Sequence, residues 1–110
     1  MAAVVQADGD LGERMRAAFE YLLADREAAV LVGTDMPFLS VDHLGDALVR
    51  LRASGGVVLG PADDGGYYLI GMTETHRGLF EGIEWGASSV LTDTLRRADG
   101  VGVDLSLIHI

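Results

Sequence analysis

A short apolar run between two segments of helical periodicity constrains the fold of this chain more than any other feature. Residues 28–33, AAVLVG, are apolar throughout and lack the alternation of a strand with one wet face. Such a strand is typically buried on both faces, as in a parallel sheet covered by helices. In the flanking segments, apolar side chains recur at the helical period. The sequence therefore predicts an α/β fold with helices packed against a sheet.

The rest of the chain continues this alternation at short spacing. Asp10 and Glu13 form a capping-box-like pair at the start of the first helix. Residues 73–82 are predicted to form a loop with one helical turn. The order α-β-α-β-β-α-β indicates a three-layer sandwich with a mostly parallel sheet. The predicted strands are 28–33, 57–59, 67–72 and 101–105. The second and third helices are predicted to follow the capping residues Ser40 and Ser88, and the third helix spans 89–98.

Composition excludes several classes of protein. The 110 residues suffice for one domain, and the net charge of −9, with eight Arg and no Lys, opposes binding to DNA or RNA. Cysteine is absent, which removes disulfides and thiolate chemistry. No apolar run is long enough to span a bilayer, and the first ten residues lack the pattern of a signal peptide. We therefore expect a cytoplasmic protein that binds neither nucleic acid nor membranes.

The first candidate site directly follows the apolar run. In open α/β sheets, ligands bind at the carboxyl ends of strands, where Gly33, Thr34 and Asp35 are predicted to lie. A carboxylate suits a divalent cation that bridges to substrate phosphates, so Asp35 is the candidate metal ligand. Gly33 would allow close approach of a substrate, and Thr34 would add a hydroxyl group. On spacing alone, Asp35 could equally well shape the turn before Pro37.

The second candidate site, Asp-Asp-Gly-Gly at 63–66, follows the strand 57–59. If this strand neighbours 28–33, both acidic segments share one edge of the sheet. The glycines would expose backbone amides, and Tyr67 and Tyr68 would point to opposite faces. Asp-Gly is also a strong signal for a hairpin turn, which is the better interpretation of an isolated DDGG. Its occurrence together with GTDMP favours a functional role.

A third candidate lies around the only tryptophan. Trp85 could form the wall of a pocket, and amides near Ser88 and Ser89 could receive an anion, although packing in the core is the commoner role of a lone Trp. The three histidines show no ligand spacing. No Ser-His-Asp arrangement and no phosphate-binding glycine loop are evident.

Four motifs in order resemble one protein family. They are GDLGERM (9–15), VGTDMPFL (32–39), GPADDGGYYLIG (60–71) and LFEGIEWGASSVL (79–91), and the resemblance covers about residues 6–104. The family is the bacterial glycosyltransferase-like family associated with radical-SAM and selenodomain genes, also called the arsenosugar-biosynthesis glycosyltransferase family and formerly a domain of unknown function. The resemblance implies a GT-A-like fold, that of the nucleotide-diphospho-sugar transferases.

The resemblance also implies a function and roles for particular residues. It implies a glycosyltransferase or nucleotidyltransferase with Mg²⁺ or Mn²⁺ held by Asp35, a nucleotide or nucleotide-sugar donor, and a small-molecule acceptor. Asp63 or Asp64 would orient an acceptor hydroxyl or complete the metal shell. The residues that would line or border the substrates are Gly33, Thr34, Gly65, Gly66, Tyr67, Trp85 and Ser88.

The sequence departs from this family at both ends. A strand and a Gly-rich basic loop, which bind the nucleotide, are expected before Gln6, and SLIHI at 106–110 does not match. We therefore expect residues 1–105 to be the C-terminal half of a transferase domain that is incomplete at both ends, followed by a non-matching tail. Such a half domain would expose apolar sheet surface and be poorly stable or form homo-oligomers.

Two other functions remain open at this point. A non-catalytic α/β binding module would have kept the fold and lost the nucleotide loop. A phosphoryl-transfer enzyme would use Asp35 as its nucleophile, and trapping of a phosphoaspartate would identify it.

Overall fold

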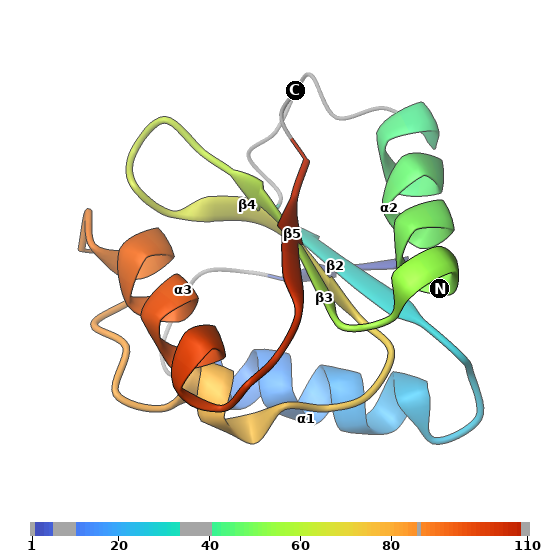
Figure 1. Cartoon of the computed structure of the whole chain (residues 1–110), viewed down its shortest axis with the longest axis horizontal. Helices are drawn as coiled ribbons and strands as arrows, with labels where there is room; N and C mark the ends of the chain where they lie inside the picture. Colours follow the sequence, from blue (N-terminus) through green and yellow to red (C-terminus); the bar gives the residue numbers. More distant parts are fainter. Residues whose placement is uncertain (1, 6–10, 34–40, 86, 109–110) are drawn as a thin grey trace.

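The chain forms a five-stranded sheet between two layers of helices (Figure 1). The computed structural model describes residues 2–5, 11–33, 41–85 and 87–108. None of the helices within these ranges is both long and apolar enough to cross a membrane. The elements are β1 (Ala2–Val5), α1 (Leu11–Leu23), β2 (Ala29–Gly33), α2 (Val41–Ser54), β3 (Val57–Pro61), β4 (Tyr67–Met72), the 3-10 helix η1 (Arg77–Phe80), α3 (Val90–Gly100) and β5 (Leu105–Leu107).

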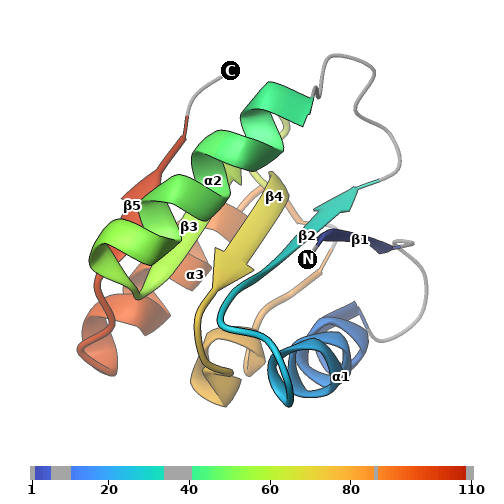
Figure 2. The same ribbon diagram turned by 90° about the vertical axis from the view of Figure 1, so that its right-hand side faces the viewer.

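Helices cover both faces of the sheet, as predicted. Helix α2 packs on one face, whereas α1, η1 and α3 pack on the other (Figures 1 and 2). Strand β2 lies inside the sheet and its residues 29–32 are buried. The predicted three-layer α/β sandwich is therefore confirmed.

The sheet is mixed, and four of its five strands run in one direction, as the prediction of a mostly parallel sheet requires. Its order is β1-β2-β4-β3-β5, with β1 parallel to β2 and β3 parallel to β5. Strand β4 is antiparallel to both of its neighbours. The reason is the short connection 62–66, because a parallel pairing of β3 and β4 would need a crossover of a dozen or more residues.

Both ends of the chain contribute strands that were not predicted at these positions. Strand β1 pairs with β2, although no strand was predicted for residues 2–5. The last strand was predicted at 101–105 but begins at Leu105, because α3 continues to Gly100 and the amide of Val101 still donates to the carbonyl of Arg97 at 3.1 Å. Part of the tail that was predicted not to match is thus integrated: Ile108 is buried, and its amide donates to the carbonyl of Leu59.

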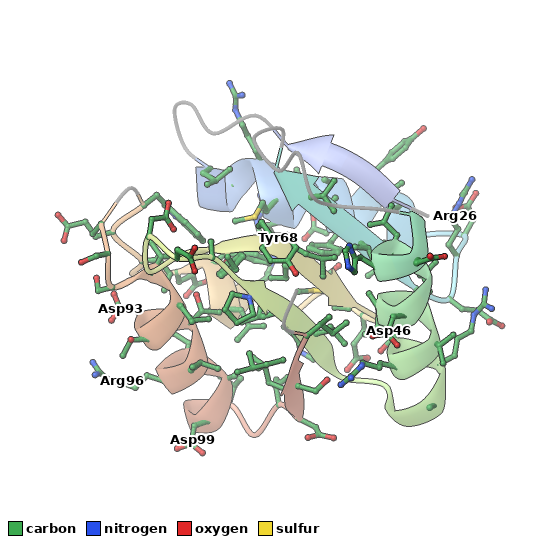
Figure 3. The ribbon with its side chains drawn as sticks, turned by 90° about the horizontal axis from the view of Figure 1, so that it is seen from above. Arg26, Asp46, Tyr68, Asp93, Arg96 and Asp99 are labelled. Carbon is green, nitrogen blue, oxygen red and sulfur yellow. The ribbon has the colours of Figure 1, made fainter. Side chains whose placement is uncertain are left out.

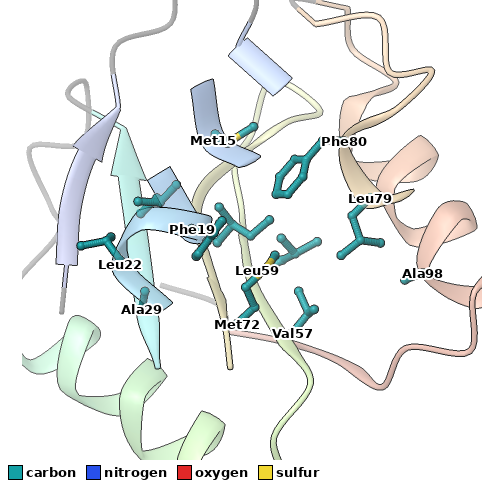
Figure 4. Close-up of a cluster of buried hydrophobic side chains, with 12 residues drawn as sticks. Met15, Phe19, Leu22, Ala29, Val57, Leu59, Met72, Leu79, Phe80 and Ala98 are labelled. Atoms are coloured by element: carbon teal, nitrogen blue, oxygen red, sulfur yellow. The ribbon is translucent and has the colours of Figure 1, made fainter. Parts of the chain in front are cut away.

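The core between the sheet and helices α1, η1 and α3, called the α1/α3 core below, is shown in Figure 4. The rings of Phe19 and Phe80 stack at its centre, with centroids 6.1 Å apart. The helical stripe predicted for α1 points into it. Its buried members are Met15, Phe19, Leu22, Ala29, Leu31, Val57, Leu59, Ile70, Met72, Leu79, Phe80 and Ala98.

A second core, called the α2 core below, lies on the opposite face. Successive residues of β2 and β3 alternate between the two cores, as the two-residue period of a strand requires. The expected exposed apolar sheet surface is not found among the side chains that the structure describes. The large apolar side chains that are exposed there, Tyr21, Val49 and Val101, lie in or next to helices.

Replacement of Gly71 tests how closely α2 approaches the sheet. A Cβ atom at Gly71 would lie 2.9 Å from Cδ1 of Leu51 and 3.0 Å from Cγ2 of Val30. We expect Gly71→Ala to lower the free energy of unfolding by about 1–3 kcal/mol, measured by urea denaturation. Gly45→Ala is the control: Gly45 lies in α2 with open space around it, so alanine should stabilise by about 0.8 kcal/mol. Equal stability of Gly71→Ala and the unaltered chain would contradict the close packing.

Candidate functional site

The carboxyl ends of β2 and β3 lie at the same edge of the sheet. Both strands are antiparallel to β4, so they run in one direction, and Val32 and Gly60 pair with Leu69 from its two sides. This common edge was predicted on the condition that the two strands are neighbours. They do not pair directly, because β4 separates them by two strand spacings, about 10 Å. The predicted common edge is present. Thr34 and Asp35, which follow β2 in the sequence, lie outside the described residues.

A tight turn at 62–66 connects β3 to β4 at this edge. The amide of Ala62 donates to the carbonyl of Gly66 at 2.9 Å, and the amide of Gly66 donates to Oδ1 of Asp64 at 3.0 Å. Gly65 adopts a φ of 90°, which favours glycine. The Asp-Gly pair therefore forms the hairpin turn that its sequence signals. Asp63 and Asp64 are nevertheless exposed at the edge where the functional interpretation places them.

The two tyrosines after this turn point to opposite faces, as predicted, and both hydroxyl groups are buried. Tyr67 packs against the α1/α3 core, and Tyr68 is 6% exposed in the α2 core. Figure 3 shows Tyr68 between the hairpin and α2. The pairing of β3 with β4 shifts register between Gly60 and Pro61. Glycine at position 60 leaves space for the ring of Tyr68.

Burial controls the ionisation of Tyr67. The hydroxyls of Tyr67 and Thr94 are both buried, and neither has a hydrogen-bond partner beyond the other among the described residues. Burial raises the pKa of Tyr67 well above its usual value, and the nearby Thr94 hydroxyl lowers it in part. Burial also raises the pKa of Tyr68. Both phenols are therefore neutral at physiological pH and can donate a hydrogen bond.

The first turn of α3 is capped by the hairpin. Ser88 was predicted to cap this helix, but the capping position is Ser89, whose side chain makes no capping hydrogen bond. Instead, the amide of Leu91 donates to the carbonyl of Gly65 at 2.9 Å. This bond satisfies one of the amides that a helix start cannot pair internally. This hydrogen bond occupies the amide of Leu91, close in the sequence to Ser88 and Ser89, whose neighbouring amides were predicted to receive an anion. Ser88 itself is exposed.

Trp85 brings three of the four sequence motifs together. Its ring meets that of Tyr67 edge to face, with centroids 6.5 Å apart and an interplanar angle of 87°. Gly12 is also close to the indole ring, since a Cβ added there would be 2.7 Å from Nε1. The GDLGERM motif thus has a packing role, since α1 approaches Trp85 through a residue without a side chain.

A hollow of about 370 Å³ lies between the start of α1 and the end of η1. The guanidinium of Arg16 pairs with Glu13 at 2.9 Å and Glu20 at 2.8 Å, and Arg77 reaches Glu20 at 3.2 Å. The hydrogen bonds from Arg16 lower the pKa of both glutamates. These acids offset the arginines, so the hollow lacks the excess positive charge that would favour phosphate groups. Its lining residues are Gly12, Glu13, Arg16, Arg77, Phe80, Glu81 and Gly82.

The edge offers carboxylate oxygens, the ligand type that Mg²⁺ and Mn²⁺ prefer. Asp63 and Asp64 each carry a carboxylate there, and one oxygen of Asp64 accepts the hydrogen bond of the turn. Within the described ranges, no three His, Asp or Glu side chains are grouped so that they could hold a metal ion.

Comparison with known proteins connects this fold to one family and one solved structure. The profile of a family described as "Uncharacterized protein conserved in bacteria (DUF2064)" matches residues 1–87. A crystal structure from Desulfovibrio desulfuricans G20, described as a "putative nucleotide-diphospho-sugar transferase", is similar over 94% of this chain, with 33% sequence identity and a TM-score of 0.85. This chain spans 46% of that protein's chain, about half of its length. No curated protein matches.

Removal of the buried phenol should change the alkaline stability of the protein. The folded-state pKa of Tyr67 is raised, so its contribution to stability is complete below the unfolded pKa and is lost as the pH rises toward the folded pKa. Urea denaturation from about pH 9 to about pH 11 should therefore show a smaller loss of stability for Tyr67→Phe than for the unaltered chain. The slopes should differ by at most about 1.4 kcal/mol per pH unit. Identical slopes would contradict a phenol that stays protonated in the fold.

Proposed function

The chain belongs to the bacterial DUF2064 family, and from this premise we propose that it forms part of a transferase acting on a nucleotide-sugar or nucleotide donor. The observation that carries this proposal is the similarity to a structure described as a nucleotide-diphospho-sugar transferase, which extends over 94% of the chain. The proposed active site is the edge of the sheet where β2 and β3 end. Ligands of open α/β sheets bind at such carboxyl ends.

On this proposal, Asp35 holds a Mg²⁺ or Mn²⁺ ion beside the phosphates of the donor. Magnesium sites of this kind use one or two carboxylates together with substrate phosphates and water, so no cluster of three acidic residues is required. When bound, the ion offsets the charge of the phosphates. This matters here because the chain carries a net charge of −9 and would otherwise repel an anionic donor. Gly33 and Thr34 lie beside the phosphates.

The hairpin supplies the acceptor side of the proposed site. Asp63 and Asp64 are exposed at the edge, where a carboxylate can orient an acceptor hydroxyl and receive its proton. The acceptor oxygen then bonds to the anomeric carbon and the nucleoside diphosphate leaves, or it bonds to the α-phosphorus and pyrophosphate leaves. Positioning of the two substrates provides most of the catalysis. Gly65 and Gly66 border the acceptor, and Trp85 and Ser88 close the far side of the site.

Metal-dependent binding of a nucleotide sugar tests this function. In the complete transferase of which this chain forms part, we expect titration calorimetry with UDP-, GDP- and dTDP-sugars to detect binding of at least one donor in the presence of Mg²⁺ or Mn²⁺ and none with EDTA. Asp35→Asn should weaken this binding by more than about tenfold, which corresponds to about 1.4 kcal/mol. Asp99→Asn is the matched control, because Asp99 is exposed near the end of α3 that lies away from the hairpin (Figure 3). Equal metal-dependent affinity of Asp35→Asn and Asp99→Asn would refute the role of Asp35.

Two substitutions of Asp64 distinguish its structural role in the turn from its proposed role in the reaction. Asparagine keeps an Oδ1 that can accept the hydrogen bond from Gly66, so Asp64→Asn should change stability by no more than about 0.5 kcal/mol. If the carboxylate receives a proton from the acceptor, Asp64→Asn should lower kcat by about 10²–10⁴-fold. Asp64→Ala should lose the turn as well, at a further cost of about 1 kcal/mol in urea denaturation. Full activity of Asp64→Asn would contradict this role of Asp64 and leave Asp63 as the candidate carboxylate at the acceptor side. Loss of activity in Asp63→Asn would then identify it.

A further inference from the structure

The hairpin and the first turn of α3 support one another through backbone contacts. Gly65, in the turn at 62–66, accepts the hydrogen bond from the amide of Leu91 at 2.9 Å. No capping bond from the side chain of Ser89 competes with it. The start of α3 thus depends on a carbonyl group of the hairpin, and the hairpin is tied to α3.

Glycine is required where these two segments meet. A Cβ atom built on Gly65 would overlap the carbonyl oxygen of Ser88, and the φ of 90° at Gly65 disfavours every other residue. The contact is between two backbones, so rotation of a side chain cannot relieve it. The turn therefore lies directly on the residue that precedes the α3 cap.

A pair of buried hydroxyl groups forms a second contact beneath the turn. Tyr67 is the first residue of β4 after the turn, and Thr94 is fully buried in the second turn of α3. The hydroxyls of both residues are buried, and no third group in the described part of the chain pairs with either of them. Thr94 is close enough to influence the ionisation of Tyr67. Buried hydroxyls are almost always paired, and Thr94 is the side chain that acts on the Tyr67 hydroxyl from the adjoining helix.

We propose that α3 is the positioning element for the acid-bearing hairpin, and that a hydrogen bond between the hydroxyls of Tyr67 and Thr94 is its buried link. Gly65, Tyr67 and Thr94 are then positioning residues, because Asp63 and Asp64 lie in the turn that α3 holds. Their importance for a reaction rests on the proposed function, whereas the physical link between hairpin and helix does not. The role of Tyr67 is accordingly to hold the turn from within the core.

Hydrogen exchange of backbone amides in the full chain, measured by NMR without any ligand, tests the link. Tyr67→Phe and Thr94→Val each remove one hydroxyl and keep the shape of the side chain. We expect either change to speed exchange of the Leu91 and Ala62 amides by about fivefold or more, because the local opening that exposes them becomes easier. Thr94→Ser retains a hydroxyl and should return the exchange rates to those of the unaltered chain.

Tyr68→Phe is the control for loss of a buried phenol. The hydroxyl of Tyr68 is also buried and has no partner among the described residues, but the residue packs in the α2 core, on the opposite face of the sheet from α3. We expect Tyr68→Phe to leave exchange at Leu91 within about twofold of the unaltered chain. If Tyr67→Phe speeds exchange at Leu91 no more than Tyr68→Phe does, the link is refuted.

The positioning role has a separate readout, so that its failure can be told from a failure of the proposed function. In the active transferase, Thr94→Val should lower kcat with little change in KM for the donor, and Thr94→Ser should restore kcat. An unchanged kcat in Thr94→Val, with exchange at Leu91 accelerated, would overturn the positioning role and leave the link in place. Absence of any transferase activity in the unaltered protein would refute the proposed function, while the exchange result would still decide the link.

Discussion

The hydrogen bonds that β4 makes on both of its edges hold the rest of this structure in place. Strand β4 pairs with β2 on one side and β3 on the other, and both of its faces are covered by helices. Its antiparallel direction makes the sheet mixed and brings the ends of β2 and β3 to one edge. Its insertion also sets the separation between the ends of β2 and β3, after which the two acidic segments follow in the sequence. The distance between the proposed donor and acceptor sides is therefore fixed by one strand that bears neither Asp35 nor Asp64.

Local patterns predicted much of the fold because the sheet is covered on both faces. The apolar run at 28–33 and the stripe of α1, which includes Met15 and Phe19, report burial directly. The position of β4 between β2 and β3 could not be predicted in this way, because a pairing between distant segments leaves no local pattern. The last strand was misplaced for a related reason: Val101 and Val103 are apolar, yet they follow the end of a helix and turn back toward it.

The candidate site shows why a hairpin signal and a functional motif were hard to separate. In DDGG, the Asx turn of Asp64 and the positive φ of Gly65 account for the hairpin, while both acids still face solvent at the predicted edge. The sequence identified these residues but not what holds them. The carbonyl of Gly65 that caps α3, and the ion pair of Arg77 with Glu20 across 57 residues, depend on how whole elements pack.

The only tryptophan in the sequence is an intrinsic fluorescent probe of how this protein packs. Trp85 contacts Gly12 of α1 and the ring of Tyr67 at the start of β4. Its fluorescence arises at a junction of the first helix, the central strand and the segment that leads into α3. A shift in emission would thus report a change in how these elements fit together, without an attached dye, and Tyr67 is near enough to pass excitation energy to the indole.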